Sequence, residues 1–282
     1  MALFFMLLSS LCYVVGYSLT KLLTGRFDVP PLQITFVRCG FVLAAGSATV
    51  LWRRGSLRAR ILEPRLAWAQ RAAAALLVLA NILAITAYAL MPVTTATALT
   101  FLTPLFVVAL GGWLLRERVG TARWIGTVIG FAGMLLIVHP GGGTPVLGVA
   151  VSVVCAVSYA GYQIMTRRLR DVASAFDMAV QVAFVGTIGL ALPAWALWHP
   201  PSPSAWALLV AFVSVQTLAL VSLNLALQRA EVSRIAPWQY TELIWAMLID
   251  LGLFGNLPPG LSLLGGLLIV GGGLLAQRRS AP

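Results

Sequence analysis

Residues 97–141 read TALTFLTPLFVVALGGWLLRERVGTARWIGTVIGFAGMLLIVHPG. Two long apolar runs occupy this stretch, and a basic segment containing Arg116, Arg118 and Arg123 separates them. A hydrocarbon layer of about 30 Å is crossed by about 20 apolar residues in a helix. We therefore predict two membrane-spanning helices, near residues 94–115 and 122–139, joined by a short basic connection.

The rest of the 282 residues contain similar runs, which raise the number of predicted spans to ten. These lie near residues 2–21, 32–52, 72–90, 94–115, 122–139, 146–166, 175–198, 205–228, 235–255 and 260–276. The runs are continuously apolar, whereas the strands of an outer-membrane barrel alternate apolar and polar residues. The predicted fold class is an all-α membrane protein with ten transmembrane helices.

The composition excludes several classes of protein. Apolar residues make up 60% of the chain and charged residues only 10%, whereas a soluble domain has about 45–50% apolar and about 25% charged residues. A soluble enzyme, a nucleic-acid-binding module and a disordered protein are therefore poor interpretations. The three scattered cysteines match neither a disulfide framework nor a zinc site, and no P-loop lysine, GxSxG or HExxH motif occurs. We expect no enzymatic activity, no metal and no cofactor.

The distribution of basic residues predicts an orientation. If both termini are cytoplasmic, all of the 19 lysines and arginines except Lys21, Arg26 and Arg38 fall in cytoplasmic connections. Cytoplasmic loops of membrane proteins carry such an excess. We therefore predict a multi-pass protein of a bacterial-type cytoplasmic (inner) membrane, whose net charge of +11 faces anionic lipid headgroups rather than nucleic acid.

The two halves of the chain resemble each other. Residues 11–23, LCYVVGYSLTKLL, align with residues 154–169, VCAVSYAGYQIMTRRL, and each half later has a span with a proline and then a glycine-rich span. Each half has five predicted spans, and because five is odd the second half must cross in the opposite sense. We predict two inverted five-helix repeats, residues 1–140 and 146–282, around a central cavity, an arrangement typical of secondary transporters. A loose alignment of any two apolar stretches is the alternative.

These motifs carry a family resemblance. Residues 97–141 resemble the fourth and fifth helices of the EamA-type branch of the drug/metabolite transporter superfamily, with Glu117 thirteen residues after Pro104. Residues 236–274 resemble the ninth and tenth helices, although Asn256 stands where that branch usually has an acidic residue. The resemblance covers nearly the whole chain. It implies a ten-helix permease whose first, third, fourth, sixth, eighth and ninth helices surround the pore, with export as the usual direction.

Polar and aromatic side chains recur at helical spacing on those same six helices. A single tyrosine or tryptophan is as readily an interface anchor or a packing residue, but their convergence on six helices favours a substrate site. The candidate substrate-binding residues are Tyr17, Asn81, Tyr88, Phe101, Tyr159, Tyr162, Gln163, Gln216, Asn224, Trp238, Tyr240, Glu242 and Trp245. Pro104 and Pro237 interrupt helical hydrogen bonding and are either hinges for alternating access or static kinks.

Three ionisable residues, Arg38, Glu242 and Asp250, fall at membrane depth, where such residues are functional candidates. Glu242 is predicted to bind a substrate ammonium or a proton, with a structural carboxylate as the alternative. Arg38 and Asp250 have similar depths and form a candidate structural ion pair. The fifth and tenth spans are instead rich in glycine, which indicates close helix packing within the chain or, less favoured, dimerisation.

Together these observations predict a secondary transporter of small organic metabolites that works by alternating access. Amino acids, including aromatic and hydrophobic ones, fit the aromatic and amide character of the site. A broader permease for vitamins, drugs or other metabolites, such as riboflavin-like or cationic compounds, is the second interpretation. A channel and a non-transporting scaffold are interpretations of a different class. The expected partners are the small-molecule substrate and the lipid bilayer, and the chain is expected to be a monomer or a weak homodimer.

Overall fold

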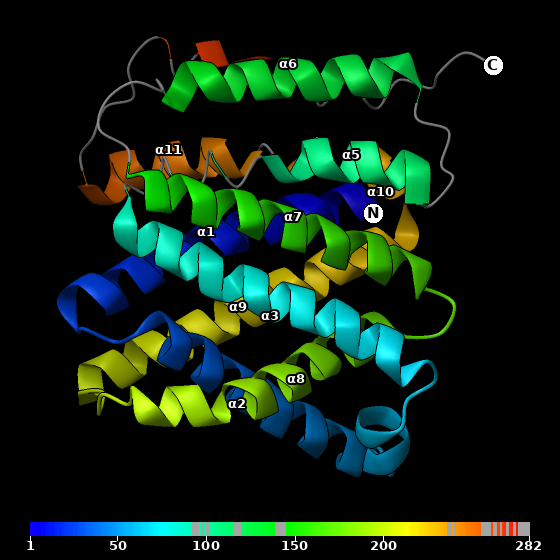
Figure 1. The fold of residues 1–282 in the computed structure, drawn as a ribbon, viewed down its shortest axis with the longest axis vertical. Coiled ribbons are helices and arrows are strands. Elements are labelled where there is room, and N and C mark those ends of the chain that lie inside the picture. The colour runs from blue at the N-terminus through cyan, green and yellow to red at the C-terminus, as the bar shows by residue number, and fades with distance from the viewer. Residues whose placement is uncertain are drawn as a thin grey trace.

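The computed structural model describes residues 1–91, 102–114, 120–138, 145–235 and 241–254, together with positions 96, 99, 238, 239, 261, 264, 265, 267, 268, 271, 272 and 275. Within these residues the regular structure is entirely helical, as predicted (Figure 1). The helices are α1 (Ala2–Arg26), α2 (Pro31–Trp52), η1 (Arg58–Leu62), α3 (Ala67–Leu90), α5 (Leu102–Leu114), α6 (Thr121–Val138), α7 (Val146–Arg168), α8 (Ala175–Ala196), α9 (Pro203–Arg229), α10 (Val232–Ile235) and α11 (Thr241–Phe254).

Six of these helices are long and apolar enough to cross a membrane. They are α1, α2, α3, α7, α8 and α9, with 22 to 27 residues each, and they match six of the ten predicted spans. The predicted spans near 94–115 and 122–139 correspond to the shorter described helices α5 and α6. The last predicted span, near 260–276, falls largely outside the described residues.

The segment predicted as one span near 235–255 differs from that prediction. Helix α10 is described as Val232–Ile235 and α11 as Thr241–Phe254, and Trp238 and Gln239 between them have 3-10 geometry. In the sequence, Pro237 lies between α10 and these two residues, and a proline disfavours helical geometry at the residue that precedes it. The side chains of this segment therefore do not follow the spacing of one continuous helix.

Helix ends coincide with polar and proline signals in the sequence. The Ser174 hydroxyl accepts a hydrogen bond from the Asp177 backbone N–H at 3.1 Å, and the Asp177 carboxylate accepts one from the Ser174 backbone N–H at 3.1 Å. Helix α9 starts with Pro203 after Ser202, whose hydroxyl accepts from the Ala205 N–H at 3.2 Å. These caps satisfy backbone donors that the first turn of a helix leaves unpaired.

The long helices pack in pairs from the two halves of the chain. Helix α1 packs against α9, α3 against α7, and α2 against α8. Figure 1 shows α2 and α8 at one edge of the bundle and α6 at the opposite edge, with α1, α3, α7 and α9 between them. This arrangement brings α1, α3, α5 and α7 around the centre, where the candidate site lies.

Glycine allows one very close helix contact. A Cβ atom added at Gly272 would lie 2.5 Å from the Gly126 carbonyl oxygen and 2.9 Å from the Gly130 backbone nitrogen. Small residues permit this approach of two helix backbones. At this position the glycines of the two predicted glycine-rich spans therefore pack against each other within the chain.

This contact predicts a difference between two adjacent glycines. Gly272→Ala should destabilise the protein by about 1–3 kcal/mol, because the methyl group overlaps backbone atoms that cannot move independently. Gly271→Ala is the matched control, since a Cβ atom there meets nothing within 4 Å, and better helix propensity should make it neutral or slightly stabilising. Thermal unfolding in detergent measures both. Equal unfolding temperatures for the two variants would contradict the close packing.

Candidate functional site

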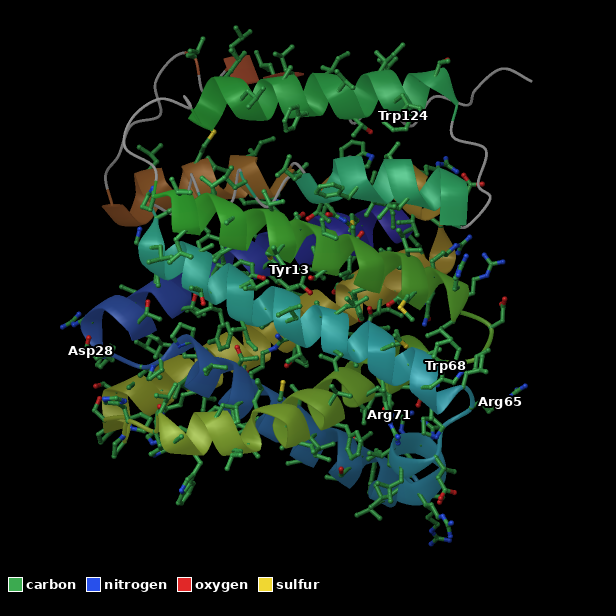
Figure 2. All side chains as sticks on the ribbon, in the orientation of Figure 1. Tyr13, Asp28, Arg65, Trp68, Arg71 and Trp124 are labelled. Atoms are coloured by element: carbon green, nitrogen blue, oxygen red, sulfur yellow. The ribbon has the colours of Figure 1, made fainter. Side chains whose placement is uncertain are left out.

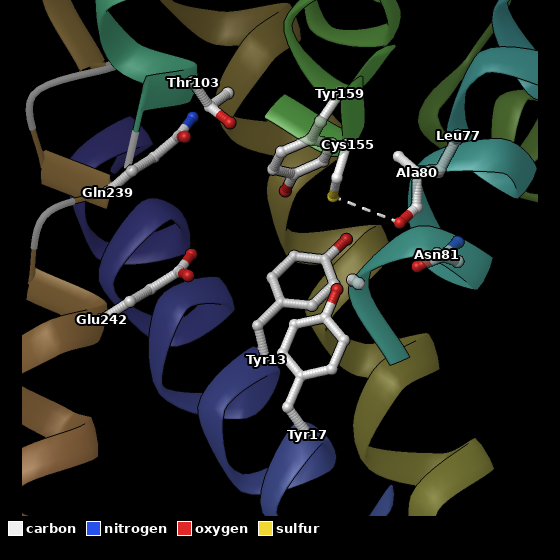
Figure 3. Close-up of a pocket in the computed structure, with 11 residues that line it drawn as sticks. Tyr13, Tyr17, Leu77, Ala80, Asn81, Thr103, Cys155, Tyr159, Gln239 and Glu242 are labelled. Carbon is white, nitrogen blue, oxygen red and sulfur yellow. Dashed lines mark hydrogen bonds between the residues drawn. The ribbon is translucent and has the colours of Figure 1, made fainter. Parts of the chain in front are cut away.

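A cavity lies at the centre of the bundle, between α1, α3, α5, α7 and the start of α11 (Figure 3). Its volume is about 30 Å³, which is room for about two water molecules and lies below the range of about 300–1,000 Å³ that is usual for ligand sites. The lining residues are Tyr13, Tyr17, Leu77, Ala80, Asn81, Ala84, Thr103, Cys155, Tyr159, Gln239 and Glu242. The wall is therefore aromatic and apolar with a few polar groups.

Four tyrosines from three helices form a continuous aromatic cluster. Tyr13 and Tyr17 lie one turn apart on α1 with ring centroids 6.0 Å apart, and Tyr17 stacks on Tyr88 of α3 at 4.6 Å. Tyr159 of α7 meets Tyr13 edge to face at 6.2 Å. These separations are those at which aromatic rings attract each other. A flat ring entering the cavity would meet tyrosine faces and edges of the same kind.

The cavity wall has few polar groups, and only some of them have hydrogen-bond partners among the described residues. The Gln239 amide donates to Gln163 Oε1 at 2.7 Å, and the Cys155 thiol donates to the Ala80 carbonyl at 3.3 Å (Figure 3). The Asn81 amide nitrogen, in contrast, is buried without a partner among the described residues. A buried donor without an acceptor costs about 1–3 kcal/mol. Asn81 therefore brings a buried amide donor without a partner among the described residues to the cavity wall.

Glu242 supplies the one carboxylate in the described cavity wall. It lies in the first turn of α11 with 9% of its surface exposed, and Figure 3 shows its carboxylate directed toward the cavity from the side opposite Ala80 and Asn81. It forms no hydrogen bond or ion pair with the residues that the structure describes. An ionised carboxylate in an apolar interior is costly unless a cation or a proton neutralises it. The position therefore suits a positively charged group of a solute.

Four of the predicted binding residues line this cavity. They are Tyr17, Asn81, Tyr159 and Glu242. Tyr88 contacts the cavity wall through its stack on Tyr17. These residues, which share helical spacing in the sequence, lie together in the fold.

Other predicted residues lie outside the cavity, in buried contacts. The Tyr162 hydroxyl donates to Asn224 Oδ1 at 2.6 Å, and the Asn224 amide donates to the Ala175 carbonyl at 3.3 Å. This chain of hydrogen bonds ties α7, α9 and α8 together, and both side chains are fully buried. A part in substrate binding for these two residues stays a prediction.

The remaining predicted residues have three different placements. Gln163 does not line the cavity but accepts a hydrogen bond from the lining residue Gln239. Gln216 fills the space beside Gly16, where an added Cβ atom would lie 2.6 Å from its amide nitrogen. Trp238 and Trp245 do not line the cavity. Their indole nitrogens are buried without a partner among the described residues.

Several predicted residues fall on positions that the structure does not describe. Phe101, Tyr240 and Pro237 lie outside the described residues, and for Pro104 and Asp250 only the helical backbone is described. Arg38 is 97% buried on α2, since only 3% of it is exposed. It forms no hydrogen bond or ion pair with the described residues. Its pairing with Asp250 therefore stays a prediction.

Besides the three aliphatic lining residues Leu77, Ala80 and Ala84, four lining residues with polar or aromatic side chains were not among the predicted binding residues. They are Tyr13, Thr103, Cys155 and Gln239. Helical spacing held a signal for three of them, because Tyr13 precedes Tyr17 by four residues, Cys155 precedes Tyr159 by four, and Gln239 precedes Glu242 by three. Thr103 has no such signal. Within the described residues, no group of three or more histidine, cysteine, aspartate or glutamate side chains could hold a metal ion.

Comparison with known proteins identifies a family that matches both halves of the chain and relatives that match part of it. A model of the EamA-like transporter family matches residues 1–139 and again residues 146–277. A riboflavin transporter of Vibrio cholerae is 32% identical over 182 residues, which are 64% of this chain and 60% of that protein. An S-adenosylmethionine uptake transporter of Rickettsia conorii is 31% identical over 180 residues, 64% of this chain and 61% of that protein. The match thus spans about three fifths of each of these curated relatives.

The fold is also found among solved crystal structures. A crystal structure of a protein superposes with a TM-score of 0.77 at 22% sequence identity, and the match covers 98% of this chain and 94% of that chain. The likeness extends over the full bundle rather than one half.

Proposed function

Because the chain belongs to the EamA-like transporter family, we propose that it is a secondary transporter that moves a small organic solute across a membrane by alternating access. The observation that carries this proposal is the central cavity, whose wall combines stacked tyrosines with the carboxylate of Glu242. Three of the six span-length helices, α1, α3 and α7, supply part of its wall. A solute site at the middle of a helical bundle is the usual arrangement in secondary transporters.

The substrate that fits this wall best has a flat ring and a positive charge. The ring would stack on Tyr17 or Tyr13, and the charge would lie at Glu242. S-Adenosylmethionine has both features, an adenine ring and a sulfonium centre, and it is the solute named for one group of relatives. Aromatic amino acids offer a ring and an ammonium group. Riboflavin, named for another relative, has the ring without a positive charge, and it is the second candidate.

The test is transport by the purified full chain in liposomes, without ATP. Labelled S-adenosylmethionine, tryptophan and riboflavin are supplied separately on each side of the membrane, so that uptake and export are both measured. We expect saturable transport of a solute that combines ring and charge, and the same solute should raise the unfolding temperature in detergent. Transport of none of the three solutes would overturn the substrate class. Single-channel conductance would overturn the alternating-access mechanism.

The pairing of helices supports the two inverted repeats, residues 1–140 and 146–282, as part of this proposal. In these repeats α1 corresponds to α7, α2 to α8, α3 to α9 and α5 to α11. If each helix is replaced by its counterpart, the packed pair α1 and α9 becomes the pair α7 and α3. Those two helices are also packed. The same exchange converts the pair α5 and α7 into α11 and α1, which are packed as well. Such symmetry lets one cavity open toward either side.

The prolines of the two repeats are proposed as hinges for that movement. Pro104 lies near the start of the described part of α5, and Pro237 precedes α11 in the sequence. Unchanged transport rates in both Pro104→Ala and Pro237→Ala would contradict this role.

We also propose that the protein resides in a bacterial-type inner membrane with both termini in the cytoplasm, as a monomer or a weak homodimer. Figure 2 shows Arg65, Trp68 and Arg71 at one end of the bundle and Asp28 at the other. Basic residues favour the cytoplasmic side, and tryptophans favour the membrane interfaces.

This orientation predicts which side of the membrane each connection faces. Ser56 and Ser204 are both exposed, near opposite ends of the bundle, and Ser→Cys is a small change at either position. In a chain without Cys12, Cys39 and Cys155, a membrane-impermeant maleimide should label Ser204→Cys in intact cells. Ser56→Cys should react only after the cells are permeabilised. The reverse labelling pattern would contradict the orientation.

A further inference from the structure

A second hollow lies on the outside of the bundle, between α2, α8 and α9. Its empty space is about 860 Å³, including the part open to the surroundings, and it shares no lining residue with the central cavity. Phe41, Ala45 and Thr49 form its α2 wall, Phe176 belongs to α8, and Ser214 belongs to α9. We call this hollow the lateral groove.

The lateral groove offers its occupant an apolar surface. Three hydroxyl groups lie along it, and each donates to a carbonyl one turn earlier on its own helix. Thr49 donates to Ala45 at 2.8 Å, Ser214 to Val210 at 2.9 Å, and Thr217 to Val213 at 2.6 Å. The rest of the wall is formed by aliphatic and phenylalanine side chains and a glycine. A hydrocarbon chain therefore fits this surface better than a polar solute.

One end of the lateral groove leads to a basic mouth. An adjoining hollow, with about 290 Å³ of empty space including the part open to the surroundings, shares Thr49 and Phe176 with the groove and is also lined by Arg53 and Arg60. Arg60 pairs with Asp177 at 3.3 Å, whereas Arg53 has no ion pair within the described part of the chain. The mouth therefore retains an excess positive charge.

The mouth is held in place by buried hydrogen bonds. Gln181 on α8 is fully buried, and its amide nitrogen lies 3.0 Å from the carbonyl oxygens of both Arg60 and Ile61 in η1. This contact fixes the backbone that carries Arg60 against α8. The position of the basic group relative to the groove is thus part of the fold.

We propose that the lateral groove and its mouth form a binding site for one anionic phospholipid. An acyl chain lies along α2 from Thr49 toward Phe41, a distance of about 12 Å at 1.5 Å per residue. The phosphate lies at Arg53, beside Arg60. An apolar groove that continues into a cationic mouth matches a molecule that joins a hydrocarbon chain to a negative headgroup, and basic residues near a membrane surface attract such headgroups. The proposal goes beyond solute transport and does not depend on the central cavity.

The test is native mass spectrometry of the full chain in detergent, titrated with phosphatidylglycerol or with phosphatidylcholine of the same acyl chains. The wild type should retain one phosphatidylglycerol with about tenfold preference over phosphatidylcholine. Arg53→Gln should reduce that preference to near unity, because the phosphate loses its unpaired cation. The matched control is Arg54→Gln, since Arg54 is exposed and does not line the mouth. It should behave as the wild type.

A second pair of variants tests the groove itself. Ala45→Trp fills the groove and should reduce retention of both lipids about tenfold. The neighbouring exposed residue Ala44 does not line the groove, and Ala44→Trp should leave retention unchanged. Ser214→Trp fills the groove from α9 and should reduce retention of both lipids in the same way, so it replaces Ala45→Trp if that variant does not fold.

Three results would overturn the proposal. The first is equal retention of the two lipids by the wild type. The second is equal retention by a groove-filling variant and its control, Ala44→Trp. The third is a dimer that groove-filling converts to a monomer, because the groove would then be covered by a second copy of the chain.

Discussion

Glu242→Gln should reduce transport of a positively charged solute about 10- to 100-fold, with little change in protein stability. Glutamine keeps the size and the hydrogen-bonding atoms of the side chain but removes the charge that faces the cavity (Figure 3). Hydrogen bonds to charged groups contribute about 1.5–3 kcal/mol, and about 1.4 kcal/mol corresponds to a factor of ten. Initial transport rates in liposomes, measured against substrate concentration, give this factor.

The matched control for this change is Glu63→Gln. Glu63 is exposed, with 63% of its side chain accessible, and it pairs with Arg58 at the surface. Its replacement should leave transport unchanged. A neutral solute such as riboflavin, if it is carried at all, should be affected less by Glu242→Gln than a cationic one. Equal rates of cationic transport in the wild type and in Glu242→Gln would show that the carboxylate has only a structural role.

Tyr17→Leu should raise the KM for a ring-containing solute about tenfold, while Tyr17→Phe should stay close to the wild type. Tyr17 is partly exposed in the cavity wall and stacks on Tyr88 at 4.6 Å and near Tyr13 at 6.0 Å. Leucine retains an apolar side chain but loses the flat face, which contributes about 0.5–1.5 kcal/mol beyond the buried area. The KM of each variant is measured with the solute that the liposome assay identifies.

The control for loss of an aromatic ring lies on the same helix. Phe4 on α1 is 63% exposed and lies outside the cavity wall, so Phe4→Leu should not change the KM. Thermal unfolding of Tyr17→Leu without solute separates a loss of binding from a loss of folding. If Tyr17→Phe were as impaired as Tyr17→Leu, the hydroxyl rather than the ring would be the recognition group.

The sequence predicted the helical spans well because their signal is local. A run of about 20 apolar residues satisfies its own backbone hydrogen bonds as a helix, whatever its neighbours are. Helices α1, α2, α3, α7, α8 and α9 all follow such runs. The segment around Pro237 was predicted less well, because the apolar run continues there while the described helix α10 ends at Ile235.

The candidate site was predicted in part, for a related reason. Polar side chains in an apolar span cost free energy, so they are candidates for a functional role. This criterion, together with the recurrence of aromatic residues, selected four residues of the cavity wall: Glu242, Asn81, Tyr17 and Tyr159. The sequence does not distinguish Tyr17, which lines the cavity, from Tyr162, which is fully buried and hydrogen-bonded to Asn224. Both residues have the same character in the sequence, and only their neighbours differ.

Span length, apolarity and charge asymmetry are properties of single segments, so the amino-acid order alone was enough to predict a helical membrane protein, and the resemblance of its motifs to a known family indicated a transporter. Which residues line the cavity depends instead on how each helix is rotated about its axis and packed against its neighbours. Packing placed Tyr13 and Cys155 in the wall, tied Tyr162 to Asn224 and opened the lateral groove beside Arg53. These outcomes arise from contacts between residues distant in the chain, and helical spacing within one span carries no information about the helix that it will face.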